Sequence, residues 1–272
     1  INNNLSQVDL GPVFDDGEIK RIFCDLVYSF STLVDVLFFP HYVQSDMRPQ
    51  PAKGLFYSFI KWGKLLINYS STKKFVDLVG EGEASFFLFA MQLEHDFQIV
   101  KYSHYNDLIE PIEEVVYSFS KGGNNESQLI FKNHPCDLGI RNWKVIIAQL
   151  AMKYGIDDRV YFIDGGVSLD KLLKNCSGLV TVNSTSGLRS LQLGCPVKSL
   201  SSAIYSMPGL TFQGDLDDFW EKPIKPDQNN VAAFVNVIAS KLHIRGLFFN
   251  EPGMSGGIRD FADKLVSRNV GI

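Results

Sequence analysis

Small hydroxyl residues gather where one apolar stretch of the chain gives way to a helical pattern, in "LVTVNSTSGLRSLQLGCPV" at residues 179–197. A strand that passes into a helix there would expose free backbone N–H groups and the positive end of a helix dipole, which favour an anion. Hydroxyl groups add donors, and a glycine lets an anion approach the backbone. N-capping by Ser or Thr explains the same residues, so both interpretations stand. The candidates are Asn183, Ser184, Thr185, Ser186 and Gly187.

Polar residues also follow three other apolar runs. "KNHP" brings Lys132 and His134, whose side chains would share one face if a strand persisted to that point. "DGG" begins at Asp164. A His-Pro taken alone is more often structural, but several polar strand ends together favour a site for a phosphate-bearing ligand. The stretch "QLEHDFQI" adds Gln92, Glu94, His95 and Asp96.

Several common nucleotide and metal motifs are missing from the sequence. "GEGEAS" at residues 80–85 lacks the lysine of a Walker loop, and no G-x-G-x-x-G follows a strand pattern. These absences argue against simple NTPases and dinucleotide enzymes. No ligand-spaced carboxylates cluster, and the cysteines lack C-x-x-C spacing, which predicts neither a zinc site nor a disulfide framework and favours a reducing compartment. The cysteines are Cys24, Cys136, Cys176 and Cys195.

Composition excludes other classes of protein. A chain of 272 residues with 45% hydrophobic residues is long enough for one large domain or two modest ones. The formal net charge of -4 argues against a general nucleic-acid binder. Asp25 and Asp35 interrupt the most apolar segment, residues 22–40, so no membrane span is expected.

The order of segments predicts an α/β fold, a Rossmann-like parallel sheet with helices on both faces. From about residue 84, five short apolar runs alternate with four longer amphipathic ones, which is typical of right-handed βαβ crossovers. Two more helices are expected at 229–242 and 257–268. Because parallel strands end at one edge of a sheet, the polar residues named above are expected to converge there.

The first part of the chain has a different texture. It shows no βα alternation and predicts two helical stretches, roughly 17–37 and 52–70, separated by a segment with three prolines. We therefore expect a helical region, residues 1–82, and an α/β domain, residues 83–272. Because the chain begins at Ile1 without a methionine, we also expect it to be a piece of a longer protein.

Six stretches carry a resemblance to a known family: "FPHY", "QLEHDFQI", "KNHP", "YFIDGG", "VTVNSTSGLRSLQLGCPV" and "AIYSMPGLTFQGDLDDFW". In this order along the chain they resemble the capsule polysaccharide biosynthesis proteins of Gram-negative bacteria, a family that contains the retaining β-Kdo transferases. Family members carry a further N-terminal Rossmann-like domain. The resemblance implies that the chain is the C-terminal, donor-binding half of a GT-B glycosyltransferase, preceded by a helical linker.

The resemblance also implies a substrate and roles for the candidate residues. The family's donor is CMP-Kdo, and no metal or other cofactor is implied. His134, Lys132 and the residues 184–187 would stabilise the leaving phosphate. Asp96 matches the acidic residue of the family's Q-x-x-x-D motif and is the candidate nucleophile of a double displacement, with a capping aspartate as the alternative.

Weaker expectations concern the sugar, the nucleoside and the last of the six stretches. Gln92 and Ser103 are expected to orient the sugar or its carboxylate. Asp164 and Gly165 are expected to meet the base or ribose, although a tight Gly-Gly turn explains them equally well. Phe219 and Trp220 are expected to pack in the core rather than stack on a ligand.

The partners implied are a nucleotide-sugar donor, a lipid-linked or oligosaccharide acceptor and a capsule biosynthesis or export complex, without nucleic acid. A lipid-linked acceptor implies a cytoplasmic protein at the inner face of the cytoplasmic membrane. Two alternatives stay open. One is an inverting GT-B transferase that uses CMP-sialic acid, and the other is a non-catalytic nucleotide-binding or assembly subunit of a capsule complex.

Overall fold

The computed structural model of the chain describes residues 18–39, 85–94, 96–137, 139–165, 167–244 and 253–266, with the single residues Phe56, Phe59, Gly63 and Gly246. The helix predicted at 52–70 lies outside the described residues apart from three of those positions, as do His95 and Gly166. The chain divides into two compact units. One covers residues 16–226, and the other contains residues 227–272.

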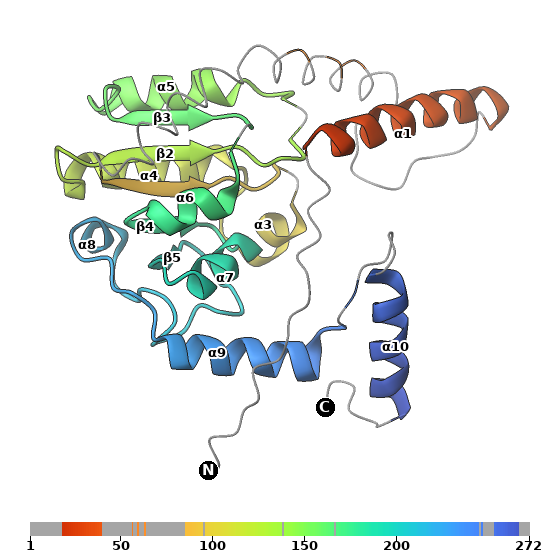
Figure 1. Cartoon of the computed structure of the whole chain (residues 1–272). Coiled ribbons are helices and arrows are strands. Elements are labelled where there is room, and N and C mark those ends of the chain that lie inside the picture. Colours follow the sequence, from red (N-terminus) through yellow and green to blue (C-terminus); the bar gives the residue numbers. More distant parts are fainter. Residues whose placement is uncertain are drawn as a thin grey trace. The chain divides into compact units, whose positions relative to one another are not determined.

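Five parallel strands form a single sheet in the first unit (Figure 1). Their order across the sheet is β3-β2-β1-β4-β5. Leu88 of β1 lies opposite Ile130 of β2 on one side and Leu179 of β4 on the other. The predicted parallel sheet in strand-helix alternation is therefore confirmed. The strands are β1 Phe86–Ala90, β2 Gln128–Lys132, β3 Val160–Ile163, β4 Gly178–Thr181 and β5 Val197–Ser199.

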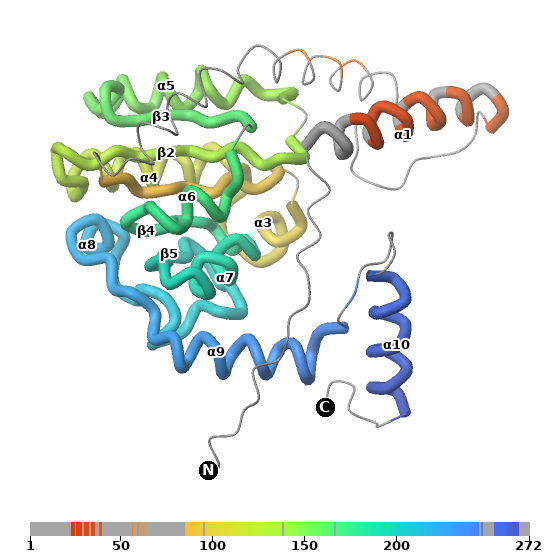
Figure 2. The backbone as a smooth tube through the Cα atoms, viewed as in Figure 1, coloured from red at the N-terminus to blue at the C-terminus, as the bar shows by residue number. Residues whose placement is uncertain are grey.

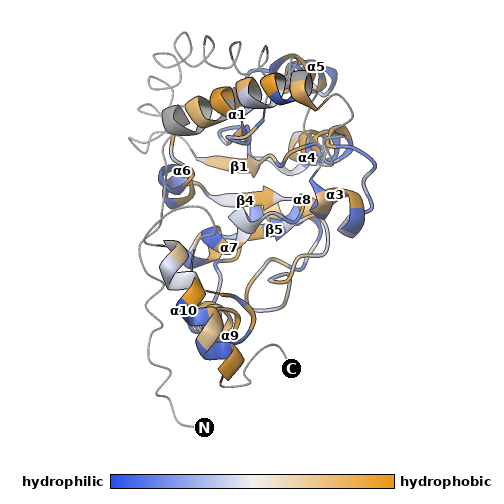
Figure 3. Cartoon of the chain, turned by 90° about the vertical axis from the view of Figure 1, so that its right-hand side faces the viewer, coloured by the Kyte–Doolittle hydropathy of each residue, from blue (hydrophilic) through white to orange (hydrophobic). Residues whose placement is uncertain are grey.

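Helices connect the strands and cover both faces of the sheet. Figure 3 shows α6 and α7 on one side of the strands and α4 and α8 on the other, so the predicted two-sided arrangement is confirmed. Two helices, α3 and α8, were not predicted, because six residues are too few to reveal a helical period. The helices of this part are α3 Phe97–Tyr102, α4 Ile109–Gly122, α5 Trp143–Lys153, α6 Leu169–Asn175, α7 Thr185–Gln192 and α8 Leu216–Glu221.

Alternation along the strands divides the core between the two faces. Phe87 and Phe89 of β1 belong to a cluster with side chains of α4, α5 and α8, whereas Phe86 and Leu88 point to the opposite face and are equally buried. A strand buried on both faces reads as a continuous apolar run. This explains why β1 carries the sequence "FFLFA" rather than alternating polar residues.

Aromatic rings join α8 to the sheet and to α4. Trp220 lies edge-on to Phe87 and to Phe119, with ring centroids 5.0 and 5.2 Å apart. Its Nε1 donates a hydrogen bond of 2.7 Å to Ser118 Oγ, and Ser118 Oγ donates to Asp217. Trp220 and Phe219 are both buried. The prediction that these two residues pack in the core is confirmed.

Three further helices agree with the sequence to within a few residues. Helix α1 covers Glu18–Phe38. In the second unit, α9 covers Gln228–Val237 and continues into a π-helical turn, Ile238–Leu242, and α10 covers Gly253–Val266. None of the described helices is long and apolar enough to cross a membrane.

Candidate functional site

The strand order distinguishes one position at the carboxyl edge of the sheet, between β1 and β4. From β1 the chain moves outward to β2 and β3, and it then crosses back to β4 on the other side of β1 (Figure 2). The order of strands therefore reverses between β1 and β4. In open α/β sheets, ligands bind outside the carboxyl ends of the strands at such a switch point. The residues that follow β1 and β4 begin with Met91 and Val182.

Gln92 and Asn183 bridge this switch point with their side chains. Gln92 Nε2 donates to Asn183 Oδ1 at 3.0 Å, and the backbone N–H of Asn183 donates to Gln92 Oε1 at 3.1 Å. Both residues are buried, with 4% and 6% of their surface exposed. A buried amide must be satisfied in this way, because an unpaired one costs free energy. The two predicted residues are thus brought into direct contact, and they hold the two loops together.

Asp96 is hydrogen-bonded to Gln92 of the same pair. Its Oδ2 accepts a hydrogen bond of 3.3 Å from Gln92 Nε2, and its Oδ1 accepts one of 2.9 Å from the backbone N–H of Gln98. The second contact makes Asp96 the N-cap of α3. Asn183 Nδ2 donates to Gln98 O at 2.7 Å, so the start of α3 is fixed from both sides. The carboxylate keeps lone pairs on both oxygens beyond these contacts.

Ser103 lies at the opposite end of α3. Its Oγ donates to Ile99 O at 2.7 Å and accepts from the backbone N–H of Tyr105 at 3.2 Å. The six residues of α3 lie between Ser103 and Asp96, which places the two residues about 10 Å apart along the helix axis. The structure does not bring Ser103 together with Gln92 and Asp96.

The hydroxyl cluster after β4 forms the start of α7. Ser184 is the N-cap, and its Oγ accepts from the backbone N–H of Ser186 at 3.2 Å. The capping interpretation is therefore observed, and Thr185 is exposed in the first turn. The helix begins at the carboxyl edge, where its dipole favours an anion.

Close packing explains why residue 187 is a glycine, and this packing could not be predicted from the sequence. A Cβ atom at this position would lie 2.3 Å from Tyr205 Oη and 2.5 Å from Cζ, closer than real atoms approach. Tyr205 donates from its hydroxyl to Ser184 O, and burial raises its pKa. Tyr205 therefore packs against the first turn of α7, and position 187 must be a glycine to leave room for its ring.

A second polar group follows β2 and β3. Strand β2 ends at Lys132, which is buried, so His134 lies beyond the strand rather than on its face. Asn133 organises this group, since its Nδ2 donates to both Asp137 Oδ2 and Asp164 Oδ1 at 3.0 Å. Asn133 was not among the residues predicted from the sequence, although its place inside "KNHP" directly after a strand is the signal that points to it.

His134 is held in one orientation by its own loop. Its backbone N–H donates to Asn133 Oδ1 at 2.9 Å, and its Nδ1 accepts from the backbone N–H of Cys136 at 3.1 Å. A neutral imidazole that accepts at Nδ1 carries its proton on Nε2. When the ring of His134 is neutral, its donor is therefore Nε2–H. Asp164 precedes Gly165, whose φ of 84° is a left-handed conformation that favours glycine, so the turn explanation of Gly165 is observed.

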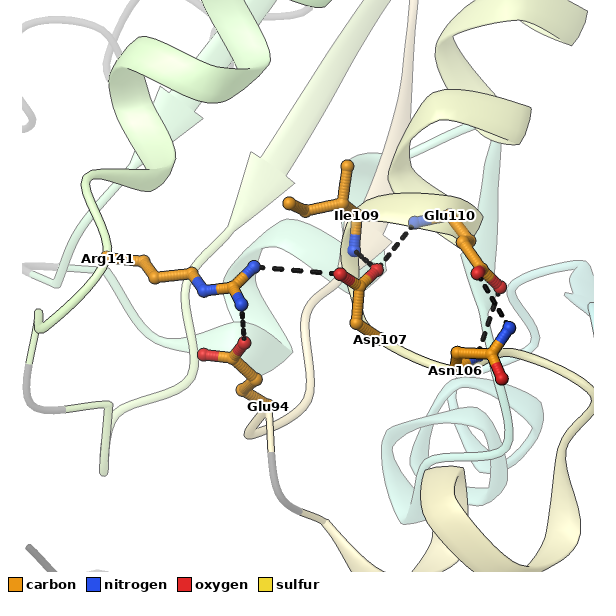
Figure 4. A network of polar contacts seen from close by, with 6 residues as sticks. All are labelled: Glu94, Asn106, Asp107, Ile109, Glu110 and Arg141. Atoms are coloured by element: carbon orange, nitrogen blue, oxygen red, sulfur yellow. Dashed lines mark hydrogen bonds and ion pairs between the residues drawn. The ribbon is translucent and has the colours of Figure 1, made fainter.

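An ion-pair network ties the loop after β1 to two other connections (Figure 4). Arg141 contacts Glu94 Oε1 at 2.5 Å and Asp107 Oδ2 at 3.7 Å. Asp107 Oδ1 in turn accepts from the backbone N–H groups of Ile109 and Glu110 at the start of α4. Arg141 and Asp107 could not be predicted as partners from the sequence, because their contact depends on how three loops pack against one another.

Arg189 follows Gly187 by two residues in helix α7 and serves a structural role. Its guanidinium makes two parallel hydrogen bonds to Asp170, one of them from Nε to Oδ1 at 3.0 Å. This pair joins α6 to α7, and the guanidinium lowers the pKa of the Asp170 carboxyl. Among the described residues, no group of three or more His, Cys, Asp or Glu side chains is arranged to hold a metal ion.

Comparisons with known proteins point to one family. The family model described as "Capsule polysaccharide biosynthesis protein" matches residues 3–249. The Escherichia coli "Capsule polysaccharide export protein KpsS" is 33% identical over 188 residues, which is 69% of this chain and 48% of that protein. The "Capsule polysaccharide modification protein LipB" of Neisseria meningitidis is 31% identical over 61% of this chain and 40% of its own length. The chain thus spans about half the length or less of these relatives.

The chain has only low similarity to solved structures. The Thermosulfurimonas dismutans "KpsC, beta Kdo 2,7 transferase" has 16% identity and a TM-score of 0.39, with 65% of this chain and 56% of that chain covered. A "MnaA-UDP co-structure" from S. aureus has 14% identity and a TM-score of 0.34, with 72% and 49% covered. Similarities at these TM-scores carry no functional argument.

Proposed function

Since the chain belongs to the capsule polysaccharide biosynthesis protein family, we propose that it is the donor-binding half of a GT-B glycosyltransferase of capsular polysaccharide biosynthesis. The proposed reaction transfers Kdo from CMP-Kdo, with retention of configuration, to a lipid-linked acceptor or a growing β-Kdo linker. The observation that carries the proposal is the linked group of Gln92, Asp96 and Asn183 at the switch point between β1 and β4.

Asp96 acts as the nucleophile in this proposal. Its carboxylate oxygen forms a bond to the anomeric carbon of Kdo while the bond from that carbon to the phosphate oxygen breaks, and the electron pair leaves with CMP. An acceptor hydroxyl then attacks the same carbon, its proton passes to a base, and the Asp96 carboxylate is released. Two displacements restore the starting configuration. The contacts of Asp96 with Gln92 and Gln98 support the role, because they fix the carboxylate before the donor arrives.

The leaving phosphate is stabilised by neighbouring donors. His134 offers Nε2–H, and the first turn of α7 offers the hydroxyl of Thr185 and the positive end of the helix dipole. Asn133 fixes the loop that carries His134. These groups need no metal, and none is part of the proposal.

The acceptor and the partners follow from the family rather than from the described residues. We place the reaction at the inner face of the cytoplasmic membrane, with the protein cytoplasmic and associated with a capsule biosynthesis or export complex. Acceptor binding and the base that activates the acceptor hydroxyl are assigned to no described residue, since the match covers only 48% of the length of the Escherichia coli relative.

Calorimetric titration of the chain with CMP, UMP and GMP tests donor recognition. We expect CMP to bind more tightly than the other two nucleotides, and equal affinities would contradict the donor assignment. In an intact relative, mass spectrometry of a stalled reaction should find the sugar on the aspartate equivalent to Asp96. A sugar on another residue would overturn the nucleophile assignment while leaving CMP recognition intact.

One observation favours a second candidate. Asp96 caps α3, a structural role that an inverting transferase for CMP-sialic acid would also tolerate. The anomeric configuration of the product separates the two, because an inverting enzyme forms no covalent intermediate. Failure to bind any cytidine nucleotide would instead favour a non-catalytic assembly subunit.

A further inference from the structure

Two cysteines face each other at the amino edge of the sheet, at the opposite end of β4 from the candidate site. Cys176 follows α6 and lies two residues before β4, and Cys195 lies two residues before β5. Their Sγ atoms are 3.1 Å apart, although 19 positions separate them in the sequence. Both are free thiols in this structure.

The backbone on both sides of this pair is fixed. The N–H of Cys176 donates to Leu172 O at 2.9 Å, and the N–H of Cys195 donates to Ser190 O at 3.1 Å. Between them, β4 and β5 are already paired, since Leu179 lies opposite Val197. Sulfur atoms in a disulfide are about 2.05 Å apart, so rotation of the two side chains brings them to bonding distance without a change of fold.

The two thiols are not equivalent. Either sulfur can donate the hydrogen bond between them. With the proton on Cys176, this contact lowers the pKa of Cys195 and, together with burial, raises the pKa of Cys176. Thiolates are the reactive form of cysteine, so Cys195 is the nucleophile and Cys176 holds the proton. Cys195 is buried and Cys176 is partly exposed, so a small oxidant reaches the pair past Cys176.

We propose that Cys176 and Cys195 are an oxidisable dithiol that hydrogen peroxide converts into an intramolecular disulfide. The Cys195 thiolate attacks one peroxide oxygen, the O–O bond breaks, and the departing hydroxide takes up the proton that Cys195 released to become water. The Cys176 sulfur then attacks the Cys195 sulfenic acid, and a second water leaves. Two thiols and one peroxide thus give one disulfide and two waters, and the sulfurs lose two electrons.

Peptide mapping tests the proposal on the reduced chain. After treatment with one equivalent of hydrogen peroxide, remaining thiols are blocked with iodoacetamide, and the protein is digested with trypsin without reductant. Cleavage after Lys174, Arg189 and Lys198 gives peptides 175–189 and 190–198, each with one cysteine. We expect these two peptides to be joined, with a mass lower than their sum by two hydrogens, while peptides with Cys24 and Cys136 remain alkylated.

Variants separate this reaction from general oxidation. A Cys24→Ser, Cys136→Ser double variant changes two exposed positions and should still give the joined peptides. In Cys176→Ser, the sulfenic acid at Cys195 should persist and be trapped by dimedone. The oxidised wild-type chain should melt several degrees above the reduced chain, and a reductant should reverse the shift.

Two outcomes would overturn the proposal. One is recovery of Cys176 and Cys195 in alkylated form after the exposed cysteines have reacted. The other is a cross-link to Cys24 or Cys136, or between two chains. Neither result depends on nucleotide binding, so the proposal is tested independently of the proposed glycosyltransferase function.

Discussion

Two polar groups of this protein lie against the same sheet but differ in their surroundings. Between α4 and α8, Ser118 links Trp220 to Asp217 beside the rings of Phe87 and Phe119. At the carboxyl edge, Gln92 links Asn183 to Asp96. In both groups a buried polar side chain is satisfied by two partners. In the first group, Ser118 and Trp220 are buried beside aromatic rings and Asp217 is exposed, whereas the second group leads to the loops after β1 and β4.

This difference in surroundings distinguishes hydrogen bonds that stabilise the fold from hydrogen bonds that hold a candidate ligand site. The buried hydroxyl of Ser118 is satisfied by Trp220 and Asp217 of α8, so these hydrogen bonds serve the packing of α8 on α4. The group at the switch point has buried amides on its inner side and the half-buried Asp96 and Ser184 on its outer side. We therefore expect changes between α4 and α8 to act on stability, and changes at the outer edge to act mainly on ligand binding or sugar transfer.

Trp220→Ala should have the largest effect. It removes a ring that contacts Phe87, Phe119 and Phe219, and the free energy of unfolding should fall by about 3 to 5 kcal/mol. Denaturant unfolding followed by circular dichroism measures it. Phe97→Ala is the control, since Phe97 is 59% exposed and should change stability by no more than about 0.5 kcal/mol. Equal effects of the two variants would show that α8 is not part of the core.

His134→Ala should act on binding instead. Loss of one charge-assisted hydrogen bond to the phosphate should weaken CMP binding by about 1.5 to 3 kcal/mol, or roughly tenfold to a hundredfold, in calorimetry. His134 is half-buried in a loop beyond β2, so the loss of stability should be smaller than that of Trp220→Ala in the same unfolding measurement. Unchanged CMP affinity would remove His134 from the site.

Asp96→Ala provides the matched comparison within the same edge. CMP affinity should remain nearly intact or improve, since a negative charge near an anion is removed, while sugar transfer by an intact relative with the same replacement should be abolished. Substantial residual transfer would contradict the nucleophile assignment. The two variants should therefore differ in kind rather than in degree.

Gln92→Leu tests the inner side of the edge. Asn183 would lose both contacts with Gln92, so stability should fall by about 1 to 3 kcal/mol in denaturant unfolding. Gln98→Ala is the control at the same helix, because the backbone of Gln98 makes the contacts and the residue is exposed. If Gln92→Leu were as stable as that control, the amide bridge would not hold the loops together.

The sheet, and the carboxyl edge that carries the candidate site, could be predicted from the sequence for physical reasons. Strands buried on both faces read as apolar runs, and the runs from β1 to β5 alternate with longer helices, so the order of elements followed. Because parallel strands end at one edge, the polar residues after them had to meet there. Gln92 and Asn183 could therefore be expected at the same edge without any knowledge of the loops.

What the sequence could not supply depends on contacts between distant loops. The packing of Tyr205 on Gly187 joins residues 18 positions apart through an irregular segment, and Arg141 reaches Glu94 from another connection. Cys176 and Cys195 show no motif spacing, yet the pairing of β4 with β5 brings them side by side. Local patterns carry none of these contacts, because each depends on the assembled sheet.

The smallest effect is expected where an ion pair joins α6 to α7. The guanidinium of Arg189 lowers the pKa of Asp170 in the folded protein, so the unfolded chain takes up the proton more readily. The stabilisation is therefore present above the unfolded pKa of about 3.9 and is lost as the pH falls through the lower folded value. Both side chains are more than a third exposed, so solvent screening limits the contribution to about 1 kcal/mol or less.

Asp170→Asn should reduce stability by that amount at pH 7 and by almost nothing near pH 2, in denaturant unfolding at both pH values. Asp157→Asn, at an exposed carboxylate in the turn before β3, is the control and should show neither change. A loss from Asp170→Asn that persisted at pH 2 would mean that the side chain packs there rather than pairs.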